Sequence, residues 1–451
     1  MSSFENLKLS EPVMKALASM GFEESTHIQD STIPLALKGK DVIGQAPTGT
    51  GKTAAFGIPM IEICDNSPSI QAIVITPTRE LAIQVSEELN KIGQFKGIRA
   101  LPIYGGQEYK WQMKGLKEKP QIIVATPGRL MDHLTKQKSI KGNDVKMLVL
   151  DEADEMLDMG FIDDIYAVME KLPAERQTLL FSATMSPEIK KIAVELMKKP
   201  HIVGQESKKV KSPAISQHYV EVHESGKFEA LCRILDTQCP DLAIVFVRTK
   251  VRVDELQEGL TRRGYAAVGL HGDMDQQRRN SIMKQFKNGK TQVLVATDVA
   301  ARGLDISDVS HVFNFDIPRD PESYVHRIGR TGRAGKSGIS ITFVTFREIK
   351  LLKLIEQVSA RRMERMEVPT LEEAIEEQQR KVIDSLREAA YGEDALRYRH
   401  LAEKLLNDND SVTLVSAALT MLIKEPDKTP VVLTEPKQGG KKKGGFRRPR
   451  K

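Results

Sequence analysis

The sequence predicts an α/β protein made of two tandem domains, each a parallel sheet with flanking helices, followed by a small helical module and a disordered basic tail. Three observations predict this fold class. Short β-branched runs alternate with amphipathic helical patterns and fall into two sets. A phosphate-binding pattern follows the first strand of the first set. The strings IIVATPGRL and VLVATDVAARG lie late in their respective sets and resemble each other, which favours two copies of one architecture.

The expected strands are short apolar runs rich in Val and Ile. In the first domain they cover 41–45, 72–76, 122–126, 147–150 and 178–182. In the second domain they cover 218–222, 243–247, 266–270, 292–297, 311–315 and 339–344. Between the sets lies HIVGQESKKVKSPA (201–214), which is polar, contains proline and is interpreted as a flexible linker. The chain therefore divides into a first domain at 1–204, a linker at 205–215 and a second domain at 216–369.

The composition is that of a soluble globular protein. The 451 residues are enough for two or three domains, and 40% are hydrophobic and 28% charged. The three cysteines have no metal-ligand spacing, so we expect reduced thiols and a cytoplasmic location. The N-terminal sequence MSSFENLKLSEP does not resemble an export signal, and no run of about eighteen apolar residues occurs. Neither export nor membrane insertion is expected.

The net charge of +6 is concentrated at the C-terminal end of the chain. The last fifteen residues, KQGGKKKGGFRRPRK, hold eight Lys and Arg and no acidic residue. Such a segment cannot bury enough apolar surface to fold, so we interpret 426–451 as a disordered basic tail that binds RNA without reading its sequence. The alternative is a solubilising end with no partner.

The string APTGTGKT (46–53) follows the first expected strand and precedes an apolar stretch. This spacing is typical of a loop whose backbone N–H groups surround phosphate oxygens at a helix N-terminus. Lys52 would reach the β- and γ-phosphates, and the Thr53 hydroxyl would bind Mg²⁺. The remaining nucleotide-binding positions of the loop are Thr48, Gly49, Thr50 and Gly51. The alternative interpretation is a structural turn.

A second motif, which is acidic, follows the apolar run MLVL. It consists of Asp151, Glu152 and Asp154. An acid at the end of a buried strand beside a phosphate-binding loop is the usual second holder of Mg²⁺, which gives Asp151 that role. Glu152 is placed to orient and deprotonate the water that attacks the γ-phosphate. Asp154 would bind a partner across a cleft. The alternative is a solvated helix start, where carboxylates favour the positive end of the helix dipole.

The chain resembles the DEAD-box RNA helicases, whose name is the string at 151–154. Further motifs of that family occur in the expected order. They are Phe4 with GFEESTHIQ (21–29), PTREL (77–81), GG (105 and 106), TPGRL (126–130), SAT (182–184), VFVRT (245–249), HGDMDQQRR (271–279), ATDVAARGLDI (296–306) and HRIGRTGR (326–333). The resemblance implies two RecA-like domains, ATP and Mg²⁺ as cofactors, RNA as partner, and RNA-stimulated ATP hydrolysis that unwinds short duplexes.

The resemblance also implies roles for residues of the ATP site and of domain coupling. Gln29 is similar to the glutamine that reads the adenine edge, with Phe4 stacked nearby. Asp305 resembles the acid that contacts the ribose, and Arg330 and Arg333 resemble arginine fingers. Ser182, Thr184 and His326 resemble residues that, with Asp154, couple hydrolysis to closure of the two domains. Without the other motifs, Ser182 and Thr184 would be interpreted as a helix cap.

The resemblance implies that one RNA strand is bound through its backbone, because small residues admit phosphates and Arg side chains clamp them. The residues are Thr78, Arg79, Gly106, Thr126, Gly128, Arg129, Arg248, Gly272 and Thr297. No aromatic residues interleave these motifs, so little sequence specificity is expected. Two alternatives stay open: an ATP-gated RNA clamp that hydrolyses slowly, and a DNA translocase, against which the Gln29 motif and the D-E-A-D string argue.

Residues 370–425 form a helical module. Thr370 lies three residues before Glu373, a capping-box pattern, and apolar residues follow at helical spacing. The module resembles the region through which Gram-positive cold-shock DEAD-box helicases form homodimers. The alternative is docking on the second domain of the same chain. The resemblance places the function in the cold-shock response, RNA decay or ribosome assembly, with proteins of the last two processes as further partners.

Overall fold

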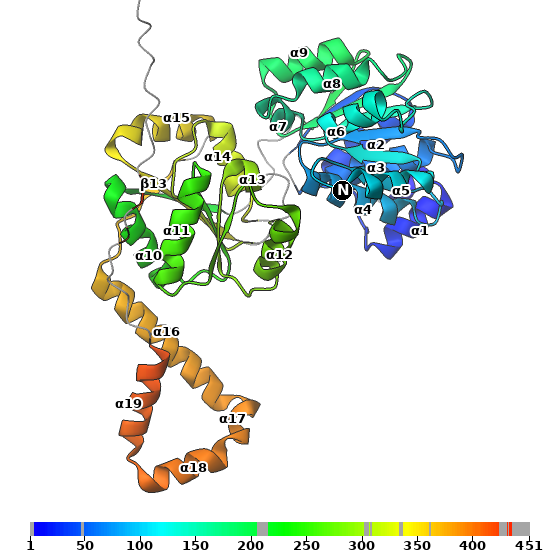
Figure 1. The fold of residues 1–451 in the computed structure, drawn as a ribbon. Helices are drawn as coiled ribbons and strands as arrows, with labels where there is room; N and C mark the ends of the chain where they lie inside the picture. The colour runs from blue at the N-terminus through cyan, green and yellow to red at the C-terminus, as the bar shows by residue number, and fades with distance from the viewer. Residues whose placement is uncertain are drawn as a thin grey trace, which may run out of the picture. The chain divides into compact units, whose positions relative to one another are not determined.

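The computed structural model describes residues 4–46, 49–204, 215–301, 306, 309–332, 337–359, 362–423, 431 and 433–434. The chain divides into two compact units, which we call domain 1 (residues 1–212 with 301–307) and domain 2 (residues 213–300 with 308–451) (Figure 1). Among the helices described, none is long and apolar enough to cross a membrane.

Domain 1 contains a parallel sheet of seven strands in the order β3-β4-β2-β5-β6-β1-β7. The strands are β1 (Val42–Gln45), β2 (Ala72–Ile75), β3 (Ala100–Ile103), β4 (Ile122–Ala125), β5 (Met147–Leu150), β6 (Gln177–Ser182) and β7 (His201–Val203). The helices are η1 (Phe4–Leu7), α1 (Glu11–Ser19), α2 (His27–Leu37), α3 (Lys52–Ile63), α4 (Arg79–Gly93), α5 (Tyr109–Lys117), α6 (Pro127–Met131), η2 (Asp132–Lys136), α7 (Ala153–Asp158), α8 (Ile162–Met169) and α9 (Pro187–Leu196).

The central strands of domain 1 are apolar throughout because helices cover both faces of the sheet. Successive residues of a strand point to opposite faces. In β5, Val149 joins the core beneath α1 to α4, whereas Leu148 and Leu150 join the core beneath α6 to α9. Burial on both faces therefore explains why the motifs at the strand ends are preceded by uninterrupted Val, Ile and Leu.

Domain 2 repeats the same topology, with the strand order β10-β11-β9-β12-β13-β8-β14. The strands are β8 (Ile215–Glu221), β9 (Ala243–Phe246), β10 (Ala267–Leu270), β11 (Val293–Ala296), β12 (His311–Asn314), β13 (Gly338–Val344) and β14 (Glu364–Arg365). The helices are η3 (Glu224–Gly226), α10 (Lys227–Gln238), α11 (Lys250–Arg262), α12 (Gln276–Lys287), α13 (Asp298–Ala301), α14 (Pro321–Ile328), η4 (Phe346–Glu348) and α15 (Ile349–Ser359). The similar strings of the two sequence sets contain β4 and β11, which occupy equivalent places, so the predicted repeat is confirmed.

All the strands expected from sequence are present, and the structure adds three at sheet edges. The first is β3, which contains Pro102. It was not predicted, because proline disfavours a strand except at a sheet edge, where one hydrogen bond to a neighbouring strand can be lost. The second, β7, pairs with β1 and corrects the interpretation of 201–204 as part of a flexible linker. The third, β14, is two residues long. Residues 205–214 of the predicted linker lie outside the described part of the chain.

The C-terminal module consists of α16 (Leu371–Tyr391), α17 (Glu393–Arg397), α18 (Arg399–Asp408) and α19 (Ser411–Leu422). The predicted capping box is confirmed, because the Glu373 amide donates to the Thr370 hydroxyl and the Thr370 amide donates to the Glu373 carboxylate. The helix α16 contacts α10 and buries Ala374. In the predicted tail, 426–451, the structure describes Val431, Leu433 and Thr434, which lie against domain 2.

Candidate functional site

The phosphate-binding pattern forms a loop between β1 and α3. Gly49 and Gly51 have φ values of 81° and 87°, a left-handed conformation that a side chain would strain. Gly51 is the N-cap of α3, so the first amides of this helix have no intrahelical acceptor and point out of the loop. Thr48 lies outside the described residues. The local geometry is that of an anion-binding helix N-terminus.

Lys52 begins α3 and is almost fully buried, at 7% exposure. Its Nζ has no hydrogen-bond partner among the residues that the structure describes. A buried ammonium group without hydrogen bonds is costly, and phosphate oxygens at the helix N-terminus would supply them. The observed state of Lys52 therefore fits a loop built to receive a polyphosphate.

Gln29 braces this loop from α2. Its Oε1 accepts from the Thr26 amide at 2.9 Å, and its Nε2 donates to the Gly51 carbonyl at 3.1 Å. The Thr26 hydroxyl donates to the Thr50 carbonyl at 2.9 Å. Both ends of the Gln29 amide are thus engaged within domain 1. Phe4 lies in η1, is buried, and contacts Phe22 edge-to-face with ring centroids 5.9 Å apart.

The acidic motif lies where β5 meets α7. Burial, reinforced by the charge of Glu152, raises the pKa of the Asp151 carboxyl to about 7, although Lys52 opposes the shift. Glu152 has φ 54° and ψ 53°, a left-handed conformation rare for residues other than glycine. Such strain persists only where the surrounding structure imposes it, and it is common at functional sites.

Asp154 connects the acidic motif to the end of β6. Its Oδ2 accepts from the amides of Ala183 and Thr184, at 3.0 and 2.9 Å, and from the Thr184 hydroxyl at 3.1 Å. The Ser182 hydroxyl donates to the Thr184 carbonyl at 2.6 Å. The structure therefore brings together Asp154, Ser182 and Thr184, three of the four residues expected to couple the domains, within domain 1.

A second group of predicted residues follows β2, β3 and β4. Thr78 caps α4, accepting from the Leu81 amide at 3.3 Å. Arg79 covers Gly106, because a Cβ added to Gly106 would lie 2.3 Å from an Arg79 guanidinium nitrogen. Thr126 is the N-cap of α6, and no described atom other than those of the chain neighbours and of the helix backbone lies within 4 Å of where a Gly128 Cβ would be. Backbone at Gly128 is thus open to close approach by a ligand.

Arg129 is held rigidly in this group. Its Nη1 donates to the Gln107 carbonyl at 2.9 Å and to Gln112 Oε1 at 3.1 Å. Its guanidinium lies 4.1 Å from the centroid of the Tyr109 ring. Arg129 therefore ties the loop after β3 to α6.

In domain 2 the corresponding residues follow β9, β10 and β11. The Arg248 amide donates to Asp316 Oδ2 at 2.8 Å, and its side chain lies 3.7 Å from Glu348. Thr297 accepts from the Ala300 amide at 3.3 Å, and the space beside Gly272 is open.

His326 lies in the last turn of α14, and Arg330 lies two residues beyond the end of this helix. The predicted residues Asp305 and Arg333 fall outside the described residues.

The residues predicted to bind ATP and those predicted to bind RNA occupy separate parts of the row of carboxyl strand ends of a sheet. In domain 1 the predicted ATP residues of the loop and acidic motifs follow the neighbours β5, β6 and β1, and the predicted RNA residues follow the neighbours β3, β4 and β2. In domain 2 the predicted RNA residues follow the neighbours β10, β11 and β9. Ligands of open parallel sheets bind at the carboxyl ends of strands, so this arrangement separates two sites on one edge.

Family models match both halves of the chain: the DEAD/DEAH box helicase model at residues 26–192 and the helicase conserved C-terminal domain model at residues 226–335. A DEAD-box ATP-dependent RNA helicase CshA of Geobacillus kaustophilus is 57% identical over 99% of this chain and 98% of its own length. The chain belongs to the DEAD-box RNA helicases. It is accordingly an ATP-hydrolysing enzyme that unwinds RNA.

Other relatives of the helicase agree with this assignment. The CshA helicase of Bacillus subtilis is 58% identical over 96% of this chain and 88% of its own length. A solved structure of Saccharomyces cerevisiae Dbp5 bound to RNA and ADP BeF3 is 32% identical, covers 84% of this chain and 100% of its own, and has a TM-score of 0.74. The two predicted RecA-like domains are confirmed.

Arg327 was not among the residues predicted from the sequence of the helicase, although it lies inside HRIGRTGR. Arg327 is 4% exposed, and its side chain donates to both oxygens of Asp298, at 2.5 and 2.8 Å. It also donates to Asn314 Oδ1 at 3.1 Å and to the Asp316 carbonyl at 2.7 Å, and lies over the Phe246 ring. These bonds fix α14, which carries His326 and is followed by Arg330, to α13 and β12.

A second unpredicted group supports Arg129. Gln112 donates to the Tyr104 carbonyl at 2.8 Å, and its Oε1 contacts His133 Nε2 at 2.8 Å as well as Arg129. His133 Nδ1 contacts the Ser139 hydroxyl at 2.6 Å. Burial, reinforced by Arg129, lowers the pKa of His133. No sequence signal distinguishes these residues from ordinary polar residues of a helix.

The residues present fit a magnesium ion. Thr53 and Asp151 offer a hydroxyl and a carboxylate, which are hard oxygen ligands, and a metal ion beside Asp151 would favour the charged carboxylate that burial disfavours. In the described ranges, no group of three or more His, Cys, Asp or Glu side chains forms a metal cage. Mg²⁺ would therefore complete its coordination with water and the phosphates of ATP, as is usual for this ion.

Proposed function

We propose that ATP binds at the strand ends of β1, β5 and β6, with Lys52 on its β- and γ-phosphates and Gln29 and Phe4 near its base. The buried, unpartnered Nζ of Lys52 is the observation that carries this proposal. Mg²⁺, held by Thr53 and Asp151, would neutralise charge on the phosphates. Glu152 orients the attacking water and accepts its proton, because phosphoryl transfer needs chiefly positioning and charge stabilisation.

The second domain completes this site in our proposal. Arg330 and Arg333 neutralise charge on the transferring phosphoryl group, and Asp305 contacts the ribose. His326 and the group around Asp154 couple hydrolysis to closure of the domains. Because domain 2 contributes no Lys-Thr phosphate loop at the equivalent place, one ATP per chain is the economical arrangement.

We further propose that one RNA strand runs along the other half of each sheet edge. Support comes from the separation of the two groups of strand ends and from the open backbone at Gly128 and Gly272. Backbone contacts of this kind give little sequence specificity, and preference for RNA over DNA would rest on 2′-hydroxyl contacts. Remodelling short RNA duplexes is needed in the cold-shock response, RNA decay and ribosome assembly, the settings we propose.

The steady-state ATPase rate tests the proposed function. It is measured without nucleic acid, with single-stranded RNA and with DNA of the same sequence, beside displacement of a short RNA duplex. Stimulation by RNA alone, with displacement, is the expected result. RNA binding that depends on ATP with almost no turnover would favour a clamp, and equal stimulation by DNA would favour a translocase.

Substituting Gly128 or Gly272 by alanine is expected to leave folding and ATP affinity unchanged and to weaken RNA binding about tenfold each. Neither glycine has a positive φ or a neighbour that an added methyl group would touch, so the methyl group would meet only a ligand. Blocking close approach removes charge-assisted contacts worth about 1.5–3 kcal/mol. RNA affinity and thermal unfolding are measured for both variants. Wild-type RNA affinity would place the strand elsewhere.

We propose that the module at 370–425 forms a homodimer. Among its described residues, Leu396, Leu401, Val412 and Met421 are each more than half exposed, and so many exposed large apolar side chains are unusual for a small module of a monomer. Sedimentation equilibrium of wild type and of the Leu401→Asp variant tests this. We expect twice the chain mass for wild type and the mass of one chain for the variant. A wild-type monomer would favour docking of the module on its own domain 2.

A further inference from the structure

A short apolar segment near the C-terminal end lies on domain 2. It is the stretch VVLTE, between Pro430 and Pro436. Val431 and Leu433 pack against the core that includes Phe228 of α10. Val431 occupies the space over Gly259 of α11, because a Cβ added there would lie 2.9 Å from its Cγ1. We call the described residues Val431, Leu433 and Thr434 the anchor segment.

Thr434 gives the anchor segment specific polar contacts. Its amide donates to Glu255 Oε2 at 2.9 Å, its hydroxyl donates to Glu255 Oε1, and its carbonyl accepts from Arg252 Nη1 at 2.9 Å. Every polar group of Thr434 is therefore bonded to α11. Contacts that use both backbone groups and the side chain of one residue specify a register, which nonspecific adhesion of an apolar stretch would not do.

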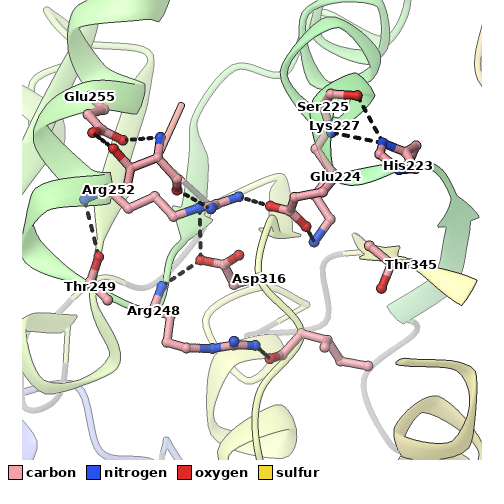
Figure 2. Close-up of polar contacts among 12 residues, drawn as sticks. His223, Glu224, Ser225, Lys227, Arg248, Thr249, Arg252, Glu255, Asp316 and Thr345 are labelled. Carbon is pink, nitrogen blue, oxygen red and sulfur yellow. Dashed lines mark hydrogen bonds and ion pairs between the residues drawn. The ribbon is translucent and has the colours of Figure 1, made fainter. Parts of the chain in front are cut away.

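Arg252 is itself held firmly (Figure 2). It is 3% exposed, pairs with Glu224, lies 3.2 Å from Asp316 Oδ2, and stacks over Phe315. The same Asp316 oxygen accepts from the Arg248 amide, and Glu224 also pairs with the buried Lys227 at 2.9 Å. The anchor segment thus binds a rigid network that continues to Arg248, one of the residues proposed to contact RNA.

The direction of the anchor segment follows from its contacts. Val431 lies at Gly259, in the third turn of α11, and Thr434 lies at Glu255 and Arg252, one and two turns nearer the N-terminus of that helix. From Val431 to Thr434 the chain therefore runs antiparallel to α11, toward the end capped by Thr249, directly after Arg248. Two residues separate Thr434 from Lys437, the first of eight basic residues, a span of at most about 11 Å.

We propose that the anchor segment fixes the basic tail, 437–451, to the RNA-binding edge of domain 2, where the tail binds phosphates of the same RNA. The proposal rests on the RNA binding proposed above. Anchoring in this way gives the tail a higher effective concentration beside the RNA than attachment to α19 alone would. Because α16 contacts α10 and the anchor segment contacts α11, it also ties both ends of the helical module to domain 2.

Glu255→Ala in the full chain tests the proposal. Glu258→Ala is the matched control, since it removes a carboxylate from the same helix that pairs only with Arg262 at the exposed surface. Thr434→Pro is a second variant that removes the amide and hydroxyl donors without altering α11. Each is measured by hydrogen exchange of the peptide containing 431–434 and by RNA affinity at several salt concentrations, with and without residues 437–451.

In wild type and Glu258→Ala, we expect slow exchange of the Thr434 amide, and deletion of 437–451 should weaken RNA binding about tenfold and flatten its salt dependence. In Glu255→Ala, exchange of the Thr434 amide should become fast; Thr434→Pro has no amide proton at this position and is judged by RNA affinity. In both variants RNA binding should fall toward the value of the deletion, and the deletion should then cost little. Fast exchange in wild type overturns the anchor. Unchanged RNA affinity in both variants overturns its role. Wild type that binds no RNA refutes the proposed function instead, while exchange still reports on the anchor.

Discussion

Replacing Glu152 by glutamine is expected to lower kcat for ATP hydrolysis by about 10²–10⁴-fold while leaving ATP affinity unchanged. Glutamine has the same shape and can keep the left-handed backbone at this position, but its amide cannot accept a proton from water. Asp151, Lys52 and the loop that binds the phosphates are unaltered. Single-turnover hydrolysis with saturating RNA, together with equilibrium binding of a fluorescent ATP analogue, measures the two quantities separately.

Two further variants make this result specific. Glu170→Gln removes an exposed carboxylate of domain 1 and should behave as wild type. Lys52→Ala should instead lose ATP binding, because it removes the buried ammonium group that has no partner other than the proposed phosphates in the described part of domain 1. Turnover of Glu152→Gln within a few-fold of wild type would show that another group deprotonates the water.

The interior of both sheets could be predicted because burial on two faces produces continuous apolar runs that end at functional residues. Strand β5 is such a run, and it pointed directly to Asp151 and Glu152. Of the four edge strands, β10 was predicted, but β3, β7 and β14 were not. In β7, His201 and Ile202 are exposed, so no apolar pattern marks the strand, and it forms only because β1 offers free backbone groups.

A site residue could be predicted where its residue type and local motif indicate one chemical role, as for Lys52 after two glycines. It could not be predicted where its role depends on contacts with residues distant in the sequence. The role of Gln29 at the adenine edge stays a prediction, but the bond from its Nε2 to the Gly51 carbonyl, 22 residues away, was not predicted. The contact between Thr434 and Arg252 joins residues 182 apart, and the anchor segment is too short to show any periodicity.

Arg327→Met is expected to destabilise domain 2 by about 3–5 kcal/mol, the usual cost of removing one partner of a buried ion pair. The methionine would fill much of the volume, but the fully buried Asn314 Oδ1 would lose its donor, and Asp298 would lose a two-pronged partner. Arg327→Lys should recover part of the loss, because an ammonium group keeps the charge but cannot bond both oxygens in one plane. Urea unfolding followed by hydrogen exchange in β11 and β12 isolates the transition of domain 2.

Arg319→Met is the control for Arg327→Met, because Arg319 is an exposed arginine on the approach to α14. It should change the unfolding free energy by less than about 0.5 kcal/mol. The comparison also separates two roles that the motif HRIGRTGR does not distinguish. If Arg327 touched the transferring phosphoryl group, Arg327→Met would unfold like wild type and lose ATPase activity. Because Arg327 is bonded to Asp298 and Asn314, we instead expect Arg327→Met to lower the stability of domain 2. The ATPase activity of the folded fraction should also fall, because α14 would no longer hold His326 and Arg330 in place.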